Sequence, residues 1–188
     1  MLSLKIIIAS TRPGRKGPAI AQWIHGKSLT HNGFNVELLD LAAINLPFLD
    51  EAAHPRMRDY KHDHTKKWSA TIDSADAFIM VTPEYNFSMP ATLKNALDFL
   101  FWEWAKKPVA FVSYGGMSGG IRSVQTLKQV VTTLKMMPLP ESIAIPFFTK
   151  HIDEQGIFKG DEQLDKSATA LLNELETWAT ALKTIRGK

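Results

Sequence analysis

The sequence contains no cysteine, which excludes disulfide-stabilised scaffolds, thiol redox enzymes and cysteine-ligated iron–sulfur proteins. No hydrophobic run is long enough to cross a membrane, and the apolar run at 6–9 is too short for a signal-peptide core. No run of five like charges occurs, and 22 basic against 19 acidic residues leave a net charge of only +3. We therefore expect a cytoplasmic protein without membrane insertion and without a nucleic-acid-binding tail.

The chain does have 188 residues, of which 45% are hydrophobic, and this is enough for a globular domain with a substantial core. We expect residues 1–188 to form a single domain, because no repeat, low-complexity tract or linker interrupts them. Apolar runs alternate with helical patterns along the whole chain. The expected strands are 2–9, 36–39, 77–81, 108–113 and 142–145, and the expected helices are 18–31, 56–74, 91–104, 119–135 and 161–185. Residues 40–55 are expected to form a loop.

Strict alternation of strands and helices is typical of an α/β protein with a parallel sheet covered by helices on both faces. Five strands and five helices fit the flavodoxin-like strand order 2-1-3-4-5, a three-layer sandwich. In this order the switch point lies between the first and third strands, and ligands bind there beyond the carboxyl ends of the strands. The loops that follow the strands are therefore the places to look for a site.

The loop at 10–17 has the composition of a phosphate site, since it holds two hydroxyls, three cations and two glycines. Hydroxyls, backbone amides and the N-terminus of the next helix can all bind phosphate oxygens. Arg12, close to the strand end, is the preferred phosphate ligand. Arg15 and Lys16 could instead meet the phosphate of a second nucleotide. The alternative is an ordinary polar loop.

The segment 83–87 offers a rigid proline, a carboxylate, a phenol, an amide and a phenyl ring in succession. Tyr85 and Phe87 can cover the face of a planar heterocycle, and Asn86 with nearby backbone amides can bind its polar edge. The alternative is a well-capped loop, because proline, asparagine and serine are common turn residues.

The segment 113–120 carries four glycines, which let a backbone approach a ligand closely. Amide groups there could face the polar edge of a flavin ring and stabilise its anionic reduced form. A flexible glycine turn is the alternative. Taken together, the three loops indicate a flavin site.

At these loops the chain resembles the NADPH-dependent FMN reductase family, which includes quinone, chromate and azo-dye reductases. The matching segments are 10–19, 82–98 and 115–120, and the order of strands and helices agrees along nearly the whole chain. The resemblance implies noncovalently bound FMN, NADPH or NADH as the reductant, and ping-pong transfer to an acceptor. Such an acceptor is a quinone, an azo or nitro compound, a free flavin or a metal oxyanion.

The resemblance also implies a set of cofactor-binding residues. They are Ser10, Arg12, Gly17, Pro18 and Ala19 at the phosphate, Pro83, Glu84, Tyr85 and Asn86 at the isoalloxazine ring, and Gly115, Gly116 and Ser118 on its other side. No catalytic side chain is assigned, because the flavin itself is the reactive centre. No metal site is expected, because His62 and His64 are two positions apart and so point to different faces of the expected helix.

Two other readings stay open. An electron-carrier flavodoxin would bind the same cofactor without turnover of its own, but such carriers tend to be acidic, and the net charge here is +3. A redox-sensing flavoprotein is the second alternative function.

The run 97–104 is apolar nearly all round, so it is either deep core or a subunit interface with aromatic anchors. We expect a homodimer or homotetramer formed through the 91–104 helix.

Overall fold

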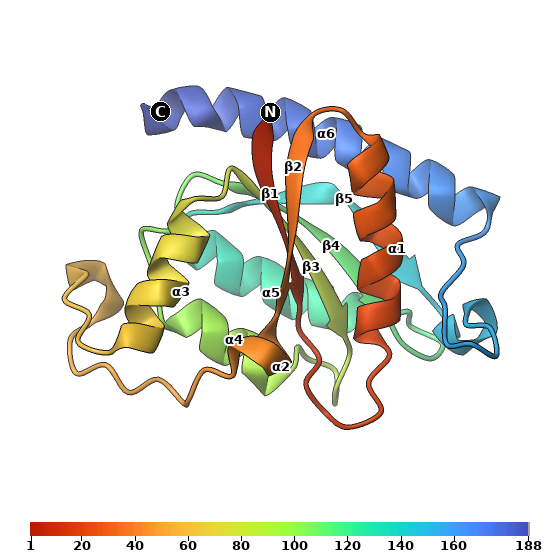
Figure 1. Cartoon of the computed structure of the whole chain (residues 1–188), viewed down its shortest axis with the longest axis horizontal. Helices are drawn as coiled ribbons and strands as arrows, with labels where there is room; N and C mark the ends of the chain where they lie inside the picture. The colour runs from red at the N-terminus through yellow and green to blue at the C-terminus, as the bar shows by residue number, and fades with distance from the viewer. Residues whose placement is uncertain (188) are drawn as a thin grey trace.

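The computed structural model describes residues 1–187 and contains a five-stranded sheet with helices on both faces (Figure 1). All neighbouring strands are parallel, and their order is β2-β1-β3-β4-β5. The predicted flavodoxin-like strand order 2-1-3-4-5 is therefore confirmed. The elements in chain order are β1 (Leu2–Ile8), α1 (Gly17–Thr30), β2 (Phe34–Asp40), α2 (Leu41–Ile44), the 3-10 helix η1 (Pro55–Met57), α3 (Asp63–Asp73), β3 (Ala77–Pro83), α4 (Ala91–Asp98), β4 (Pro108–Tyr114), α5 (Ile121–Thr133), β5 (Met137–Ile145), the 3-10 helix η2 (Phe148–His151) and α6 (Glu162–Arg186).

The two faces of the sheet pack into two separate core layers. Successive side chains of a strand point to opposite faces, so Ile7 and Met80 join α3, α4 and α5, while Ile6 and Ile79 join α1 and α6. The central strands β3 and β4 are buried along their whole lengths. This double burial explains why they read as continuous apolar runs rather than as alternating ones.

The helix expected at 56–74 begins only at residue 63, so that prediction is wrong in its first half. The backbone amides of Lys61 and His62 donate to the carboxylate of Glu51, at 2.8 and 3.0 Å, instead of entering a helix. Arg58 adopts a left-handed conformation with φ 53° and ends the short helix η1. The loop expected at 40–55 likewise contains α2.

The helix expected at 91–104 is also too long, because α4 ends at Asp98 and turns follow it. The indole nitrogen of Trp104 donates to the carbonyl of Leu97 at 3.2 Å, which gives that carbonyl a partner outside the helix. Phe99 and Trp104 are completely buried in the core of the chain itself. Tertiary packing of aromatic side chains therefore decides where α4 stops.

The last strand is longer than expected, because β5 begins at Met137 rather than at 142. Pro138 and Pro140 lie within it. Proline is tolerated there because β5 is an edge strand, and its pairing with β4 is irregular between Val109 and Phe111. The remaining bounds differ from expectation by one or two residues.

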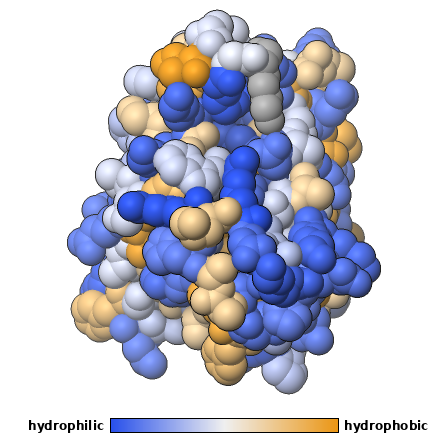
Figure 2. Space-filling model, turned by 90° about the vertical axis from the view of Figure 1, so that its left-hand side faces the viewer, coloured by the Kyte–Doolittle hydropathy of each residue, from blue (hydrophilic) through white to orange (hydrophobic). Residues whose placement is uncertain are grey.

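The face that carries α3 and the segment 45–62 before it is mostly hydrophilic, with apolar residues in small separate spots (Figure 2). Met57 is one of the exposed apolar side chains of this segment, at 73% exposure. None of the helices within residues 1–187 combines the length and the apolar character needed to cross a membrane.

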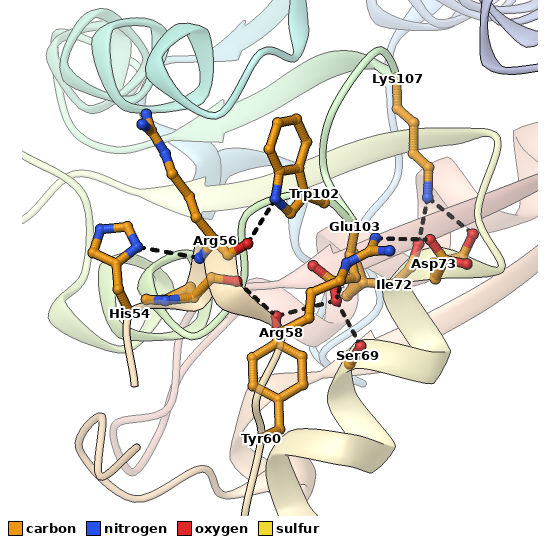
Figure 3. Close-up of polar contacts among 11 residues, drawn as sticks. His54, Arg56, Arg58, Tyr60, Ser69, Ile72, Asp73, Trp102, Glu103 and Lys107 are labelled. Atoms are coloured by element: carbon orange, nitrogen blue, oxygen red, sulfur yellow. Dashed lines mark hydrogen bonds and ion pairs between the residues drawn. The ribbon is translucent and has the colours of Figure 1, made fainter. Parts of the chain in front are cut away.

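Buried charged groups near the amino-terminal edge of the sheet bind helix ends and neighbouring hydroxyls (Figure 3). Nζ of Lys107, which is 2% exposed, donates to the carbonyls of Ile72 at 2.7 Å and Asp73 at 3.0 Å. Oε1 of Glu103 accepts hydrogen bonds from the hydroxyls of Tyr60 at 3.1 Å and Ser69 at 2.8 Å. A lysine at the C-terminus of α3 also suits the negative end of the helix dipole.

Asp76, which directly precedes β3, forms a second cluster at this edge. Its carboxylate accepts from the amide of Ser3 at 3.0 Å, from Nζ of Lys183 at 3.0 Å and from Nη2 of Arg186 at 2.6 Å. The cluster ties β1 and β3 to the C-terminal end of α6.

Candidate functional site

Three loops meet at the carboxyl-terminal edge of the sheet and enclose a cavity of about 220 Å³. The first loop (residues 9–16) follows β1, the second loop (84–90) follows β3 and the third loop (115–120) follows β4. The cavity is lined by Arg12, Arg15, Lys16, Pro83, Glu84, Tyr85, Tyr114, Gly115, Gly116 and Phe148.

Two buried hydroxyls lie at the junction of the first loop with α1. Ser10 is 1% exposed and Tyr114 is 4% exposed, and within residues 1–187 their hydroxyls contact each other but make no hydrogen bond to any other group. Gly17 lies against both of them, since a Cβ atom there would lie 2.3 Å from Oγ of Ser10 and 2.8 Å from the hydroxyl of Tyr114. Buried hydroxyls without partners are rare in folded proteins, so these two indicate a polar ligand.

Burial raises the pKa of Tyr114 to about 12. The phenol is therefore neutral at pH 7 and keeps its proton as a hydrogen-bond donor. A neutral donor beside the N-terminus of α1 favours a bound anion, because the amide groups of that first helical turn also carry partial positive charge.

Arg15 does not point to a second nucleotide but is held within the protein. Its guanidinium makes two hydrogen bonds of 2.6 Å to the carboxylate of Asp40, and Nη1 also donates to the carbonyl of Ser10 at 2.8 Å. The side-chain hydrogen bond with Asp40 raises the pKa of Arg15, and that with Arg15 lowers the pKa of Asp40. Arg12 is exposed, and its guanidinium makes no hydrogen bond or ion pair with the described residues.

The second loop is a tight hairpin. Tyr85 and Ser88 exchange two backbone hydrogen bonds of 2.9 Å, and the two residues between them, Asn86 and Phe87, have φ values of 49° and 68°. Positive φ at both central positions is typical of a type I′ turn. Phe87 is 66% exposed, and Tyr85 is partly buried at the cavity.

The third loop brings backbone close to the cavity. Gly120 has φ 83°, and a Cβ atom there would lie 2.9 Å from both Cβ of Ser113 and the amide nitrogen of Tyr114. The hydroxyl of Ser113 donates to the carbonyl of Gly119 at 2.8 Å and fixes the loop from inside. Only glycine fits at position 120, and Gly115 and Gly116 line the cavity.

The expected site residues are distributed unequally around the cavity. Arg12, Pro83, Glu84, Tyr85, Gly115 and Gly116 line it. Ser10 and Gly17 lie directly against Tyr114, which lines it too. Pro18 and Ala19, in the first turn of α1, are not among the lining residues, and neither are Asn86 and Ser118.

Two residues that line the cavity, Tyr114 and Phe148, are not among the site residues expected from the sequence. Tyr114 ends β4 at its carboxyl end, so its position in the chain was a usable signal. Phe148 comes from η2, and nothing in its local sequence predicts that the segment folds back to place its ring 5.1 Å from that of Tyr114.

A second cavity, of about 280 Å³, touches the first loop at Thr11 and otherwise lies between α2 and α4. Two of the polar side chains that line it, Thr92 and Asn95, already bind within the protein. The hydroxyl of Thr92 donates to the carbonyl of Ala9 at 2.8 Å, and Asn95 bonds to Pro47 and Leu49 at 2.7 and 3.0 Å. The cavity at Ser10 and Tyr114 is therefore the better candidate for a polar ligand.

The two histidines of α3 are arranged differently from expectation. His62 caps α3 from outside the helix, and its ring lies parallel to that of His64 with centroids 5.2 Å apart. Nε2 of His64 lies 3.0 Å from Asp50 and that of His62 lies 3.9 Å from it. The prediction of different faces is wrong because His62 is not helical. Within residues 1–187 no group of three or more potential ligands suits a metal ion.

Comparison with known proteins identifies relatives over most of the chain. A family model described as NADPH-dependent FMN reductase matches residues 3–150. An NAD(P)H-dependent FMN reductase of Schizosaccharomyces pombe is 39% identical over 166 residues, which cover 79% of this chain and 82% of that protein. An NAD(P)H:quinone oxidoreductase of Solanum tuberosum is 32% identical, covering 80% and 78%. An FMN-dependent NADPH-azoreductase of Staphylococcus haemolyticus is 29% identical, covering 90% and 91%.

Solved structures share the same fold at lower sequence identity. A flavoenzyme NAD(P)H:(acceptor) oxidoreductase from Paracoccus denitrificans superimposes with a TM-score of 0.77 at 20% identity, covering 96% of this chain and 98% of that one. An apo NADH:FMN oxidoreductase gives a TM-score of 0.70 at 19% identity, covering 93% and 90%.

Proposed function

This chain belongs to the NADPH-dependent FMN reductase family, and from that premise we propose that the cavity between the three loops holds FMN and that the protein oxidises NAD(P)H. The observation that carries the proposal is the pair of buried hydroxyls, Ser10 and Tyr114, that have no partner within residues 1–187 other than each other. A phosphate group needs several donors, and these two stand beside the N-terminus of α1.

The residues present fit the phosphate end of FMN. Ser10 and Tyr114 would each donate a hydrogen bond, and Gly17 has no side chain that would collide with the two hydroxyls. Arg12, exposed at the mouth, would add a charge-assisted hydrogen bond. Pro18 and Ala19, in the first turn, would contribute only the positive end of the helix dipole, because Pro18 has no amide hydrogen and the amide of Ala19 already donates to the carbonyl of Lys16.

The residues also fit a flat ring. Pro83, Glu84, Tyr85 and Asn86 would form one wall, with backbone amides toward the polar edge of the ring. Gly115, Gly116 and Ser118 would form the other wall, and glycine lets that backbone come close. We propose the whole chain as one FMN-binding domain.

The chemistry that FMN supplies is transfer of two electrons from NAD(P)H to an acceptor. The protein's own part is to bind, to orient and to exclude competing reactions, and no side chain is assigned as nucleophile or base. The acceptor is a small molecule, of the quinone, azo or nitro, free flavin or metal oxyanion class. Because the cavity opens to solvent, we propose that reductant and acceptor use it in turn.

An electron carrier with little turnover is the second candidate function. Its support is the shared fold, but a net charge of +3 does not suit docking on basic partners. Steady NAD(P)H oxidation with a small-molecule acceptor and no added protein decides for the enzyme. A change of oligomeric state on reduction, with negligible turnover, decides for a redox sensor.

We also propose a homodimer or homotetramer that uses the segment 91–104 and its neighbours. Phe99 and Trp104 are buried in the core and cannot contact a partner. The apolar side chains that remain exposed near them are Trp102 at 41%, Phe48 at 85% and Leu49 at 41%. Light scattering that finds only monomer at micromolar concentration would contradict this proposal.

A cytoplasmic location is proposed because NAD(P)H is supplied there.

An absorption spectrum tests the main proposal. Purified protein with added FMN should give a perturbed flavin spectrum that bleaches when NADPH or NADH is added without oxygen. Arg12→Ala should then weaken FMN binding at least tenfold, since a charge-assisted hydrogen bond is worth about 1.5–3 kcal/mol. A change smaller than about twofold would remove Arg12 from the phosphate site. Failure of the wild-type protein to bind FMN would sink the whole proposal.

A further inference from the structure

The side chain of Glu84 connects the second loop to the third loop and to α5. Oε2 accepts from the hydroxyl of Ser118 at 3.1 Å and from the backbone amide of Arg122 at 3.0 Å. Oε1 accepts from Nη1 of Arg122 at 2.9 Å. Both carboxylate oxygens are therefore bound inside the protein, and the side chain is only 11% exposed.

Arg122 also holds the tip of the second loop. Its guanidinium lies 4.0 Å from the centroid of the Phe87 ring, a cation–π distance. Phe87 has φ 68°, which is unusual for a bulky residue, and follows Asn86 with φ 49°. A turn in this conformation persists only when surrounding contacts stabilise it, and Arg122 supplies such a contact.

The Glu84 carboxylate is ionised under ordinary conditions. Burial alone would raise its pKa, but the side chain and amide of Arg122 and the hydroxyl of Ser118 outweigh that effect and lower the pKa below its usual value. The amide it accepts from belongs to the second residue of α5, where a negative charge is favoured by the helix dipole.

We infer that Glu84 and Arg122 are positioning residues that fix the distance between the second and third loops, and thereby the width of the slot for the flavin ring. This inference rests on the proposed function. It revises the part expected of Glu84, whose carboxylate would shape the slot through Ser118 and Arg122 while its backbone faces the ring. We call the three side chains of Glu84, Ser118 and Arg122 the loop clip.

The effect of the loop clip on binding can be distinguished from that of the phosphate end by comparing three flavin ligands. Lumiflavin contains the ring alone, riboflavin adds the ribityl chain, and FMN adds the phosphate. Loss of the loop clip should weaken all three ligands by one common factor, about tenfold, because it acts on the ring slot. The ratio of FMN affinity to lumiflavin affinity should stay constant, whereas Arg12→Ala should lower that ratio.

The variants are Glu84→Gln, Arg122→Met and the double variant, each titrated as apoprotein by quenching of flavin fluorescence. Glu84→Gln keeps the shape and removes the charge, and Arg122→Met keeps length and apolar contact with Phe87. The double variant should bind no more weakly than either single variant, because both remove the same contact. Arg122→Lys, which keeps the charge, should recover part of the affinity.

A control removes an exposed ion pair within α4. Lys94 and Asp98 pair at 2.7 Å with both side chains exposed, and neither lines the cavity. Lys94→Met and Asp98→Asn should leave flavin affinity unchanged. The circular dichroism of the bound flavin band, which reports the surroundings of the ring, should change in the loop-clip variants and not in these controls.

Three outcomes overturn the inference, and one of them also overturns the proposed function. If wild-type protein binds FMN and the variants bind it within about twofold, the loop clip does not position the ring and the proposed function stands. If only FMN affinity falls while lumiflavin affinity holds, the residues act at the phosphate. If wild-type protein binds no flavin, both proposals fail. Should Glu84→Gln not fold, Arg122→Lys and Arg122→Met provide the same readout.

Discussion

The two edges of the sheet differ in how far their buried polar groups are hydrogen-bonded within the protein. At the amino-terminal edge, Asp76 and Lys107 each bind two or more partners at 3.0 Å or less. At the carboxyl-terminal edge, the hydroxyls of Ser10 and Tyr114 have no partner within residues 1–187 other than each other. Since buried polar groups are normally hydrogen-bonded, the first edge is organised for stability and the second for a ligand.

Glu103 lies between these two cases. One of its oxygens accepts from Tyr60 and Ser69, while Oε2 is buried without a hydrogen bond in the part of the chain that the structure describes. Oε2 of Glu103 and Nε of Arg186 are single unsatisfied atoms in groups that are otherwise bonded, whereas two whole hydroxyls converge at one glycine, Gly17. The convergence, rather than a lone missing bond, distinguishes the ligand edge.

Asp76→Ala should have the largest effect on stability. It leaves Lys183 and Arg186 without their carboxylate and the amide of Ser3 without its acceptor. The free energy of unfolding should fall by about 3 kcal/mol or more, as for other buried pairs that lose one partner. Urea denaturation measures this loss, and Glu162→Gln, which breaks the exposed pair with Lys166, is the control that should change little. A parallel loss of FMN affinity in the folded variant would contradict the separation of the two edges.

Gly17→Ala should have the largest effect on binding. The new methyl group would lie 2.3 Å from Oγ of Ser10 and 2.8 Å from the hydroxyl of Tyr114. We expect the Kd for FMN to rise about 100-fold, equivalent to about 2.7 kcal/mol, while alanine's better helix propensity offsets part of the strain. Gly26→Ala is the matched control in the same helix, because no atom lies within 4 Å of its added Cβ. Gly26→Ala should stabilise the fold and leave FMN affinity alone; equal binding by the two variants would refute the assignment.

The same substitution, Tyr to Phe, can be made at each edge of the sheet and its effects on FMN affinity and stability compared. Tyr114→Phe should raise the Kd for FMN about tenfold and leave riboflavin affinity unchanged, because one donor to the phosphate is lost. Tyr60→Phe removes the hydrogen bond to Glu103 and should lower the free energy of unfolding by about 1 kcal/mol with no change in FMN affinity. Isothermal titration and urea denaturation of both variants check the pair of results. If both variants lose stability and neither loses affinity, Tyr114 belongs to the stabilising class.

The smallest expected effect is on the stability of the protein at acidic pH, through the carboxyl group of Asp76. Burial alone would raise the pKa of Asp76, but the amide of Ser3 and the cations of Lys183 and Arg186 lower it below the ordinary value of 3.8. A carboxyl with a lowered folded-state pKa stabilises the fold above its unfolded pKa, and this contribution disappears as the pH falls through the folded-state pKa. Stability of the wild-type protein should therefore decline more steeply than that of Asp76→Asn below about pH 4. Parallel curves of unfolding free energy against pH would show that Asp76 is not responsible.

Much of the fold could be predicted because the strands are short apolar runs separated by helical patterns. The helix bounds that failed depend on tertiary contacts: Glu51 binds the amides of Lys61 and His62, and Trp104 binds the carbonyl of Leu97. Sequence periodicity contains no information about such partners. The loop chemistry of the site is local and was visible in the sequence, but the pairing of Arg15 with Asp40 joins positions 25 residues apart and was not.

The two prolines of β5 have a consequence for how copies of the chain can meet. An open sheet edge is a template for strand addition and aggregation, because its free amides and carbonyls can pair with another chain. Pro138 and Pro140 have no amide hydrogen to offer, and the irregular pairing after Val109 breaks the even spacing that an incoming strand would need. Continuous growth of the sheet from this side is therefore blocked. On the β5 side of the sheet, whose other edge strand is β2, contacts between copies therefore have to form through helices and loops.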